Sequence, residues 1–116
     1  MQSLNLSGCN FTNHGTRAII DGLNLNRGLK YLDLSFNDLS SSIYEFAIKV
    51  SKTICRHEQL MHLNLTETYL SREELFFIGM AMKHSKALVG LHLSLNELSN
   101  YDRVFLRILM NAKAAS

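Results

Sequence analysis

The chain has 116 residues, of which 47% are hydrophobic and 19% are charged, and its formal net charge is +2. This balance is typical of a globular domain and excludes a disordered tail, and the small charge excludes a dedicated nucleic-acid binder. No apolar run approaches the roughly 18 residues that a membrane-spanning helix needs, and the N-terminal segment lacks the pattern of a signal peptide.

One motif occurs four times, starting at residues 1, 29, 60 and 88. It reads apolar-x-x-Leu-x-Leu-x-x-(Asn/Cys/Thr)-x-apolar. The Leu-x-Leu pair has the period of a β-strand, so both leucines point to one face and the residues beside them point to the other. A small polar side chain at the ninth position can bond backbone groups where the chain leaves the strand. We expect these residues to form a ladder, weaker at its cysteine and threonine: Cys9, Asn37, Thr68 and Asn96.

After the first two motifs the apolar period changes to that of a helix. In the first repeat Ile19, Ile20 and Leu23 are predicted to face the strands. In the second repeat the predicted buried stripe is Ile43, Phe46, Ala47, Val50 and Ile54. The serine run at 40–42 is predicted to cap the start of that helix. The second repeat is three residues longer than its neighbours, and we place the extra residues near 53–58, as a helix longer by nearly one turn. A functional loop at that place is the alternative.

The third and fourth repeats follow the same order of elements. Ser71 and Glu74 have the spacing of a capping box, which predicts the start of the third helix. Its predicted stripe is Leu75, Ile78 and Met82, and the fourth helix is predicted to bury Val104, Phe105, Ile108 and Leu109 behind a cap at Asn100. Strand, loop and helix in alternation predict parallel strands with all helices on one outer side.

The combined pattern, L-x-x-L-x-L-x-x-N-x-L and then G-x-x-x-L-x-x-x-L-x-x-N, resembles the ribonuclease-inhibitor-like subclass of leucine-rich repeats. Residues 1–28 match it most fully, while the other repeats match the strand half well and carry Ile43, Glu74 and Asp102 at the glycine position. The resemblance implies an α/β leucine-rich-repeat solenoid, a right-handed βα superhelix with parallel strands on its concave face and helices on its convex face. We predict one domain over residues 1–116, without terminal caps, divided into repeats 1–28, 29–59, 60–87 and 88–116.

No pattern in the chain indicates catalysis. It has no glycine-rich phosphate loop and no Gly-x-Ser-x-Gly elbow, and neither cysteine has a histidine at the spacing of a nucleophilic pair. His62, His92 and either Asp33 or Glu67 would make a minimal metal-ligand set, but nothing in the sequence fixes its geometry. We therefore predict no enzyme, no catalytic residue, no metal and no cofactor.

The two cysteines, Cys9 and Cys55, do not make a disulfide framework. The repeat pattern predicts that both are reduced thiols, buried or half-buried among hydrophobic residues. Reduced thiols favour an intracellular, cytoplasmic location.

The resemblance implies a protein that binds other proteins, and the concave face is the first place to expect binding. Aromatic side chains on a rigid sheet are good binding anchors, although scattered apolar residues are also ordinary on a protein surface. The predicted protein-binding residues are the larger and charged ones beside the strand leucines: Tyr31, Asp33, Phe36, His62, Asn64, Glu67, His92 and Leu95. The expected partner is a protein, with no nucleic acid and no membrane insertion.

A second hypothesis assigns the binding to the uncapped ends of the stack. The chain would then be a structural or assembly subunit that self-associates or packs in a larger complex. A third possibility is a fragment of a larger regulatory protein of the GTPase-activator or actin-regulator type. The sequence leaves open the identity of the partner, the biological process and the oligomeric state.

Overall fold

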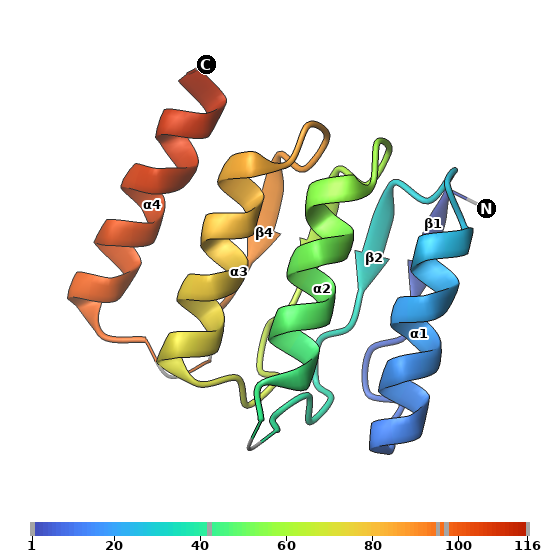
Figure 1. The fold of residues 1–116 in the computed structure, drawn as a ribbon. Coiled ribbons are helices and arrows are strands. Elements are labelled where there is room, and N and C mark those ends of the chain that lie inside the picture. Colours follow the sequence, from blue (N-terminus) through green and yellow to red (C-terminus); the bar gives the residue numbers. More distant parts are fainter. Residues whose placement is uncertain (1, 42, 95, 97, 116) are drawn as a thin grey trace.

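The computed structural model describes residues 2–41, 43–94, 96 and 98–115. In these ranges four strands alternate with four helices (Figure 1). The strands are β1 (Ser3–Asn5), β2 (Tyr31–Asp33), β3 (His62–Asn64) and β4 (Gly90–His92). The helices are α1 (Asn13–Leu25), α2 (Glu45–Arg56), α3 (Arg72–His84) and α4 (Asn100–Ala115).

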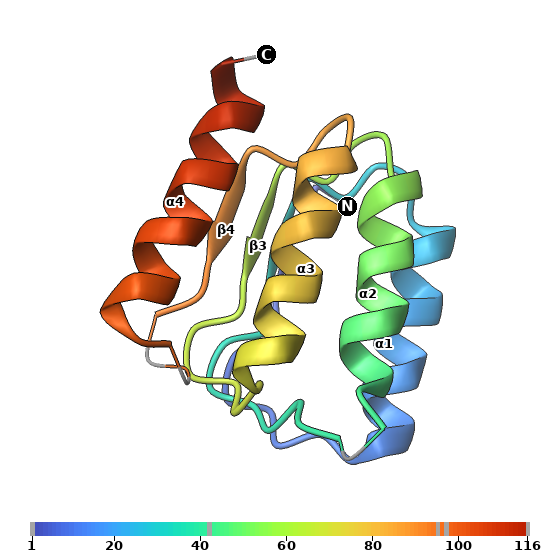
Figure 2. The ribbon, with the colours of Figure 1, turned by 60° about the vertical axis from the view of Figure 1, so that its left-hand side comes forward.

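The strands form one parallel sheet in the order β1-β2-β3-β4. The first leucines of the four motifs lie opposite one another in the register: Leu4, Leu32, Leu63 and Leu91. Helices α1, α2 and α3 form a second layer on one face of the sheet, and α4 lies beside β4 at the sheet's edge, next to α3 (Figure 2). The predicted solenoid of parallel strands and outer helices is confirmed.

The hydrophobic core lies between the two layers. The second leucines of the motifs, Leu34, Leu65 and Leu93, are buried together with most of the first ones. Leu4 and Leu6 are only half-buried, because β1 has a neighbouring strand on one side alone. Full burial of a leucine contributes about 1.5–3 kcal/mol, so this repeated pair supplies a large part of the driving force for stacking.

The predicted ladder at the ninth position is present, and Asn37 is its buried asparagine. Its Nδ2 donates to the carbonyl oxygens of Leu6, Leu34 and Ser35 at 2.9, 3.0 and 3.1 Å. Its Oδ1 accepts the backbone N–H of Asn10 at 2.9 Å. This buried side chain therefore joins the second repeat to the first.

The other ladder positions differ in strength, as their side chains predict. Asn96 repeats the pattern, since its Nδ2 donates to the carbonyl oxygen of Leu65 at 2.7 Å and its Oδ1 accepts the N–H of Thr68. Thr68 donates its hydroxyl to Leu65 within its own repeat. The thiol of Cys9 lies 3.7 Å from the carbonyl oxygen of Ser7, within its own repeat.

Two helix starts test the predicted caps. The capping box of α3 is confirmed, with Ser71 and Glu74 each accepting the other's backbone N–H. At α4 the predicted cap is wrong by one residue. Ser99 accepts the N–H of Asp102 through its hydroxyl, and Asp102 accepts the N–H of Ser99 through its carboxylate. Asn100 is the first residue of the helix instead.

The place of the three extra residues in the second repeat was predicted wrongly. Residues 34–44 link β2 to α2, eleven in all, whereas seven residues link each of the other strands to its helix. Helix α2 has 12 residues and is one shorter than α1 and α3. The insertion therefore precedes the helix, and neither a helical extension nor a loop forms at 53–58.

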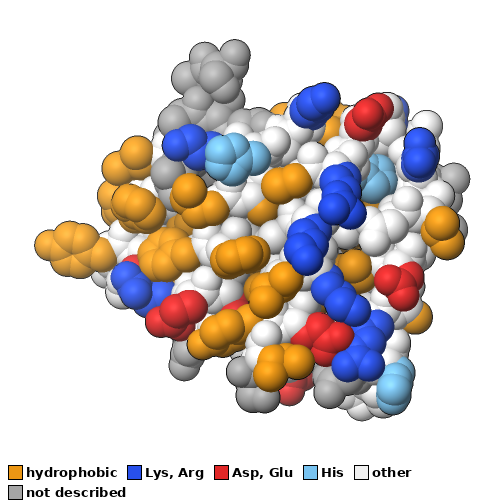
Figure 3. Space-filling view, in the orientation of Figure 1, with side chains coloured by type: hydrophobic (Ala, Val, Ile, Leu, Met, Phe, Trp, Pro, Cys, Tyr) orange, Lys and Arg blue, Asp and Glu red, His pale blue; other side chains and the backbone are white. Residues whose placement is uncertain are grey.

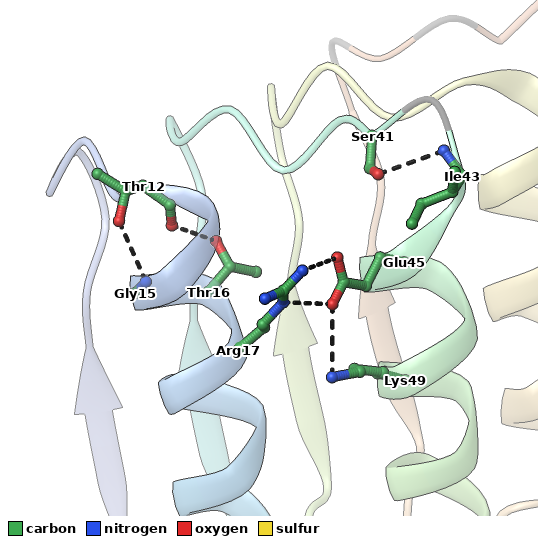
Figure 4. A network of polar contacts seen from close by, with 8 residues as sticks. All are labelled: Thr12, Gly15, Thr16, Arg17, Ser41, Ile43, Glu45 and Lys49. Atoms are coloured by element: carbon green, nitrogen blue, oxygen red, sulfur yellow. Dashed lines mark hydrogen bonds and ion pairs between the residues drawn. The ribbon is translucent and has the colours of Figure 1, made fainter.

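The cause is the local chemistry of the segment before α2. Ser41 accepts the backbone N–H of Ile43 through its hydroxyl, which favours a turn over a helix (Figure 4). Tyr44 then adopts a left-handed conformation, with φ at 55°, and the helix begins at Glu45 without a side-chain cap. The predicted cap by serines 40–42 is wrong where it can be checked, and Ser42 lies outside the described residues. Ile43 is exposed, so it does not belong to the buried stripe of α2 as predicted. Phe46 is buried, as predicted.

The predicted stripe of α4 is also wrong. Val104, Phe105 and Ile108 are exposed, and Leu106 is buried in their place. Leu106 packs against Gly79 of α3, where a Cβ would stand only 2.7 Å from its Cδ2. Apolar residues occupy two faces of α4. The face with Leu106 is buried because Gly79 leaves room for that side chain. The side chain of Leu109 lies outside the described residues.

Ion pairs join neighbouring helices on the convex side. The guanidinium of Arg17 in α1 donates to both carboxylate oxygens of Glu45 in α2, and Lys49 lies 3.4 Å from the same carboxylate (Figure 4). The hydrogen bond from Arg17 lowers the pKa of Glu45. Burial raises the pKa of Asp102 in α4, but hydrogen bonds from Arg72 and from its own cap outweigh it, so the net shift is downward.

Both cysteines are exposed, contrary to the prediction. Cys9 lies beyond β1, which is at the edge of the sheet. Cys55 follows the buried Ile54 and points to the outer side of α2, where its sulfur lies 3.7 Å from the carbonyl oxygen of Ala81.

Candidate functional site

Three aromatic rings stack across three neighbouring strands of the concave face. The ring of Tyr31 in β2 lies 5.1 Å from that of His62 in β3, with 7° between their planes. The ring of His62 lies 6.5 Å from that of His92 in β4, with 16° between the planes. We call these three side chains the aromatic stack. It forms a continuous aromatic surface on the rigid sheet.

The stack depends on a glycine. His62 lies directly opposite Gly90 in the register, and His92 stands two residues further along β4. A Cβ on Gly90 would lie 2.1 Å from Nδ1 of His62, so the histidine ring already fills the space that a side chain would take. The ring can therefore lean from β3 over β4 and reach His92.

A hollow of about 410 Å³ surrounds the stack on the concave face. Five of the eight predicted binding residues line it: Tyr31, Asp33, His62, Asn64 and His92. Phe36 and Glu67 lie in the turns that follow β2 and β3, apart from the hollow. Leu95 lies outside the described residues.

Asp33 and Asn64 have a structural use that the sequence analysis missed. Asp33 accepts the N–H of Ser35 through Oδ1, and Asn64 accepts that of Thr66 in the same way, at 2.9 and 3.0 Å. Both bonds span two residues and hold the chain as it leaves the strand. Asn5 makes the same bond after β1. These side chains shape the floor of the hollow, and the aromatic rings above them offer the larger contact surface.

Phe36 is a bulky residue in an unusual backbone conformation. Its φ is 58°, a value that costs most residues about 1–2 kcal/mol, and its side chain is 55% exposed. The same position of the first repeat holds Gly8, with φ at 63°. The N–H of Phe36 donates to the carbonyl oxygen of Thr66 at 3.0 Å, which holds the turn. A large apolar side chain is thus kept exposed where glycine would suit the backbone better.

The described part of the chain contains no group of three or more His, Cys, Asp or Glu side chains close enough to hold a metal ion. Within the same ranges, no helix has both the length and the apolar character needed to cross a membrane.

Comparison with known proteins identifies the repeat. A family model described as Leucine Rich Repeat matches residues 1–24 and 28–47. The chain is a leucine-rich-repeat protein. A human relative, NACHT, LRR and PYD domains-containing protein 13, is 36% identical over 98 residues. The match covers 84% of this leucine-rich-repeat chain, which spans 9% of the relative's length.

Two solved structures share the fold of this leucine-rich-repeat chain. Leiomodin-1 Actin-Binding Site 2 has a TM-score of 0.78 at 16% identity, covering 94% of this chain and 63% of the other. The tropomodulin C-terminal domain of Caenorhabditis elegans has a TM-score of 0.67 at 13% identity, covering 99% and 85%. Identities this low show the fold alone. The solenoid is confirmed, and the ribonuclease-inhibitor-like subclass stays a prediction.

Proposed function

We propose that this chain is a non-catalytic module that binds a protein partner through its concave face, with the aromatic stack as the anchor. Leucine-rich-repeat proteins are typically interaction modules of this kind. The observation that carries the proposal is the stacking of Tyr31, His62 and His92 across three strands. A cytoplasmic location goes with the proposal.

The energetics favour the stack as a binding anchor. Aromatic residues are common among the few interface residues whose truncation costs 2 kcal/mol or more. The rings already rest on one another, so binding a partner would remove little of their conformational freedom. Phe36 adds an exposed ring in the turn after β2, where the left-handed conformation recurs at Gly8 and Glu67 of the neighbouring repeats. Together these features support a preformed surface that fits an apolar or aromatic segment of a protein.

Site-specific photo-crosslinking in cells tests the proposal. A benzophenone amino acid would replace Phe36 in the turn after β2 or, as a matched control, Ala18, which is exposed on α1. We expect crosslinked partners from position 36 and none of the same partners from position 18. Combining the probe at 36 with His62→Ala should remove the crosslinks. Equal crosslinking from both positions, or crosslinks that survive His62→Ala, would contradict the proposal.

Actin is a second candidate partner, because the leiomodin-1 domain that shares this fold is named as an actin-binding site. At 16% identity the likeness does not extend to partners, so actin enters as a protein to be tested. Cosedimentation with actin filaments and anisotropy with labelled actin monomers are the direct assays. Binding that Tyr31→Ala weakens would identify actin as the concave-face partner. No binding in either assay would remove actin as a partner.

A further inference from the structure

Helix α3 exposes large apolar side chains on its outer side, although α2 and α4 flank it on both sides. Phe77 is 52% exposed and Met80 is 43% exposed. With Cys55 and Phe76 they form the apolar floor of a groove of about 800 Å³ between α2 and α3. We call this feature the convex groove. Because α3 belongs to an interior repeat, stacking of further repeats would not cover it.

The repeat architecture does not require these apolar residues. The buried residues Leu23 in α1 and Met82 in α3 hold the same position of the repeat, which sets the alignment of the two helices. In this alignment Ala18 and Asp21 of α1 correspond to Phe77 and Met80 of α3. The two corresponding residues of α2 are both lysines. The fold accepts small or polar residues at these positions, as the first two repeats show. The third repeat has large apolar residues at both, which points to a contact.

The Lys and Arg side chains at the convex groove lie on its α2 side. A band of Lys and Arg side chains runs beside a broad hydrophobic area that covers α3 and α4 (Figure 3). Lys52 and Arg56 line the α2 side of the groove, and Glu73 is the acidic residue on its α3 side. Lys49, further along α2, is already paired with a carboxylate. The groove thus offers an apolar floor with a basic border along α2.

We propose that the convex groove binds an amphipathic helix of a partner protein, with an apolar stripe over Phe77 and Met80 and acidic residues beside Lys52 and Arg56. Grooves between parallel helices bind such helices through residues spaced three and four apart. Helices α2 and α3 have 12 and 13 residues. They therefore run together for about 18 Å, which matches roughly three turns of a bound helix. This site lies on the opposite side of the molecule from the aromatic stack and is independent of it.

Fluorescence anisotropy with two designed peptides tests the proposal on the full chain. Both peptides would be labelled helices of about 18 residues with the same leucine stripe. One would carry glutamates beside the stripe and the other lysines. We expect the acidic peptide to bind at least tenfold more tightly than the basic one. The variant Phe77→Ala with Met80→Ala should weaken the acidic peptide at least tenfold, while Tyr31→Ala leaves it unchanged.

A charge-reversal variant separates electrostatic selection from apolar contact. Lys52→Glu with Arg56→Glu should reverse the preference in favour of the basic peptide, and circular dichroism would verify that each variant is folded. Failure of both peptides to bind, equal binding of both, or binding that survives Phe77→Ala with Met80→Ala would overturn the proposal. Light scattering that finds a dimer, dissociated by the same double variant, would also overturn it, because the groove would then hold a second copy of this chain.

Discussion

Replacing Asn37 by alanine removes a buried side-chain bridge between the first two repeats. Its Nδ2 has two N–H groups that serve three carbonyl oxygens, and it is buried. At least two of these acceptors would lose their donor. An unsatisfied buried group costs about 1–3 kcal/mol, so we expect Asn37→Ala to lower the free energy of unfolding by about 2–4 kcal/mol. That is a large share of the roughly 5–15 kcal/mol typical of a domain.

The same motif position in other repeats supplies matched controls. Thr68→Ala removes one hydroxyl bond to a carbonyl oxygen and should cost about 1 kcal/mol. Cys9→Ala changes an exposed side chain and should stay within about 0.5 kcal/mol of the parent. Urea unfolding followed by far-ultraviolet circular dichroism measures all three variants on one scale. The ladder explanation is refuted if Asn37→Ala costs no more than Cys9→Ala.

Three further predictions follow from local geometry. Gly90→Ala should push the His62 ring out of the aromatic stack, visible as shifted histidine ring resonances in NMR spectra, while the fold is retained. Ser71→Ala removes the cap of α3 and should lower the free energy of unfolding by about 1 kcal/mol in the urea assay. Glu45 and Asp102 have lowered pKa values in the fold. Their stabilising contribution is therefore complete above the ordinary carboxyl pKa of about 4 and is lost as the pH falls through the lower folded values. Glu45→Gln with Asp102→Asn should flatten the acid dependence of the melting temperature, and an unchanged acid profile would contradict this assignment.

The strand half of each repeat could be predicted from the sequence because its signals are local. The spacing of Leu63 and Leu65 sets both the period of the strand and the face that it buries. The cap at Ser71 could be predicted for the same reason, since both partners of the box lie within one turn. Such features depend on neighbours in the chain and hardly on the rest of the fold.

The helix half depends on contacts between repeats, which the sequence does not display. The length of the second repeat shows that three residues are extra, but the turn at Ser41 and Tyr44 decides on which side of α2 they lie. In α4, apolar residues on two faces compete for the core. Leu106 is buried because Gly79 of the neighbouring helix leaves room for it. Periodicity within one helix cannot choose between the two faces.

The candidate sites divide in the same way. Tyr31 and His62 hold the same position of neighbouring repeats, and the register places them opposite each other. It could not show that His62 leans over Gly90 to meet His92, since that needs the direction of the ring. The run FFIGMAM at 76–82 has more apolar residues than one buried stripe needs, and this excess is the sequence signal for the convex groove.

The most direct test of the concave-face proposal is the affinity of the partner crosslinked at Phe36, measured by calorimetry. The comparison is between Tyr31→Ala with His62→Ala in the aromatic stack and Phe77→Ala with Met80→Ala in the convex groove. The proposal predicts that the first pair weakens binding at least thirtyfold, about 2 kcal/mol, and that the second pair leaves it unchanged. An affinity that survives the loss of Tyr31 and His62 would contradict the central claim.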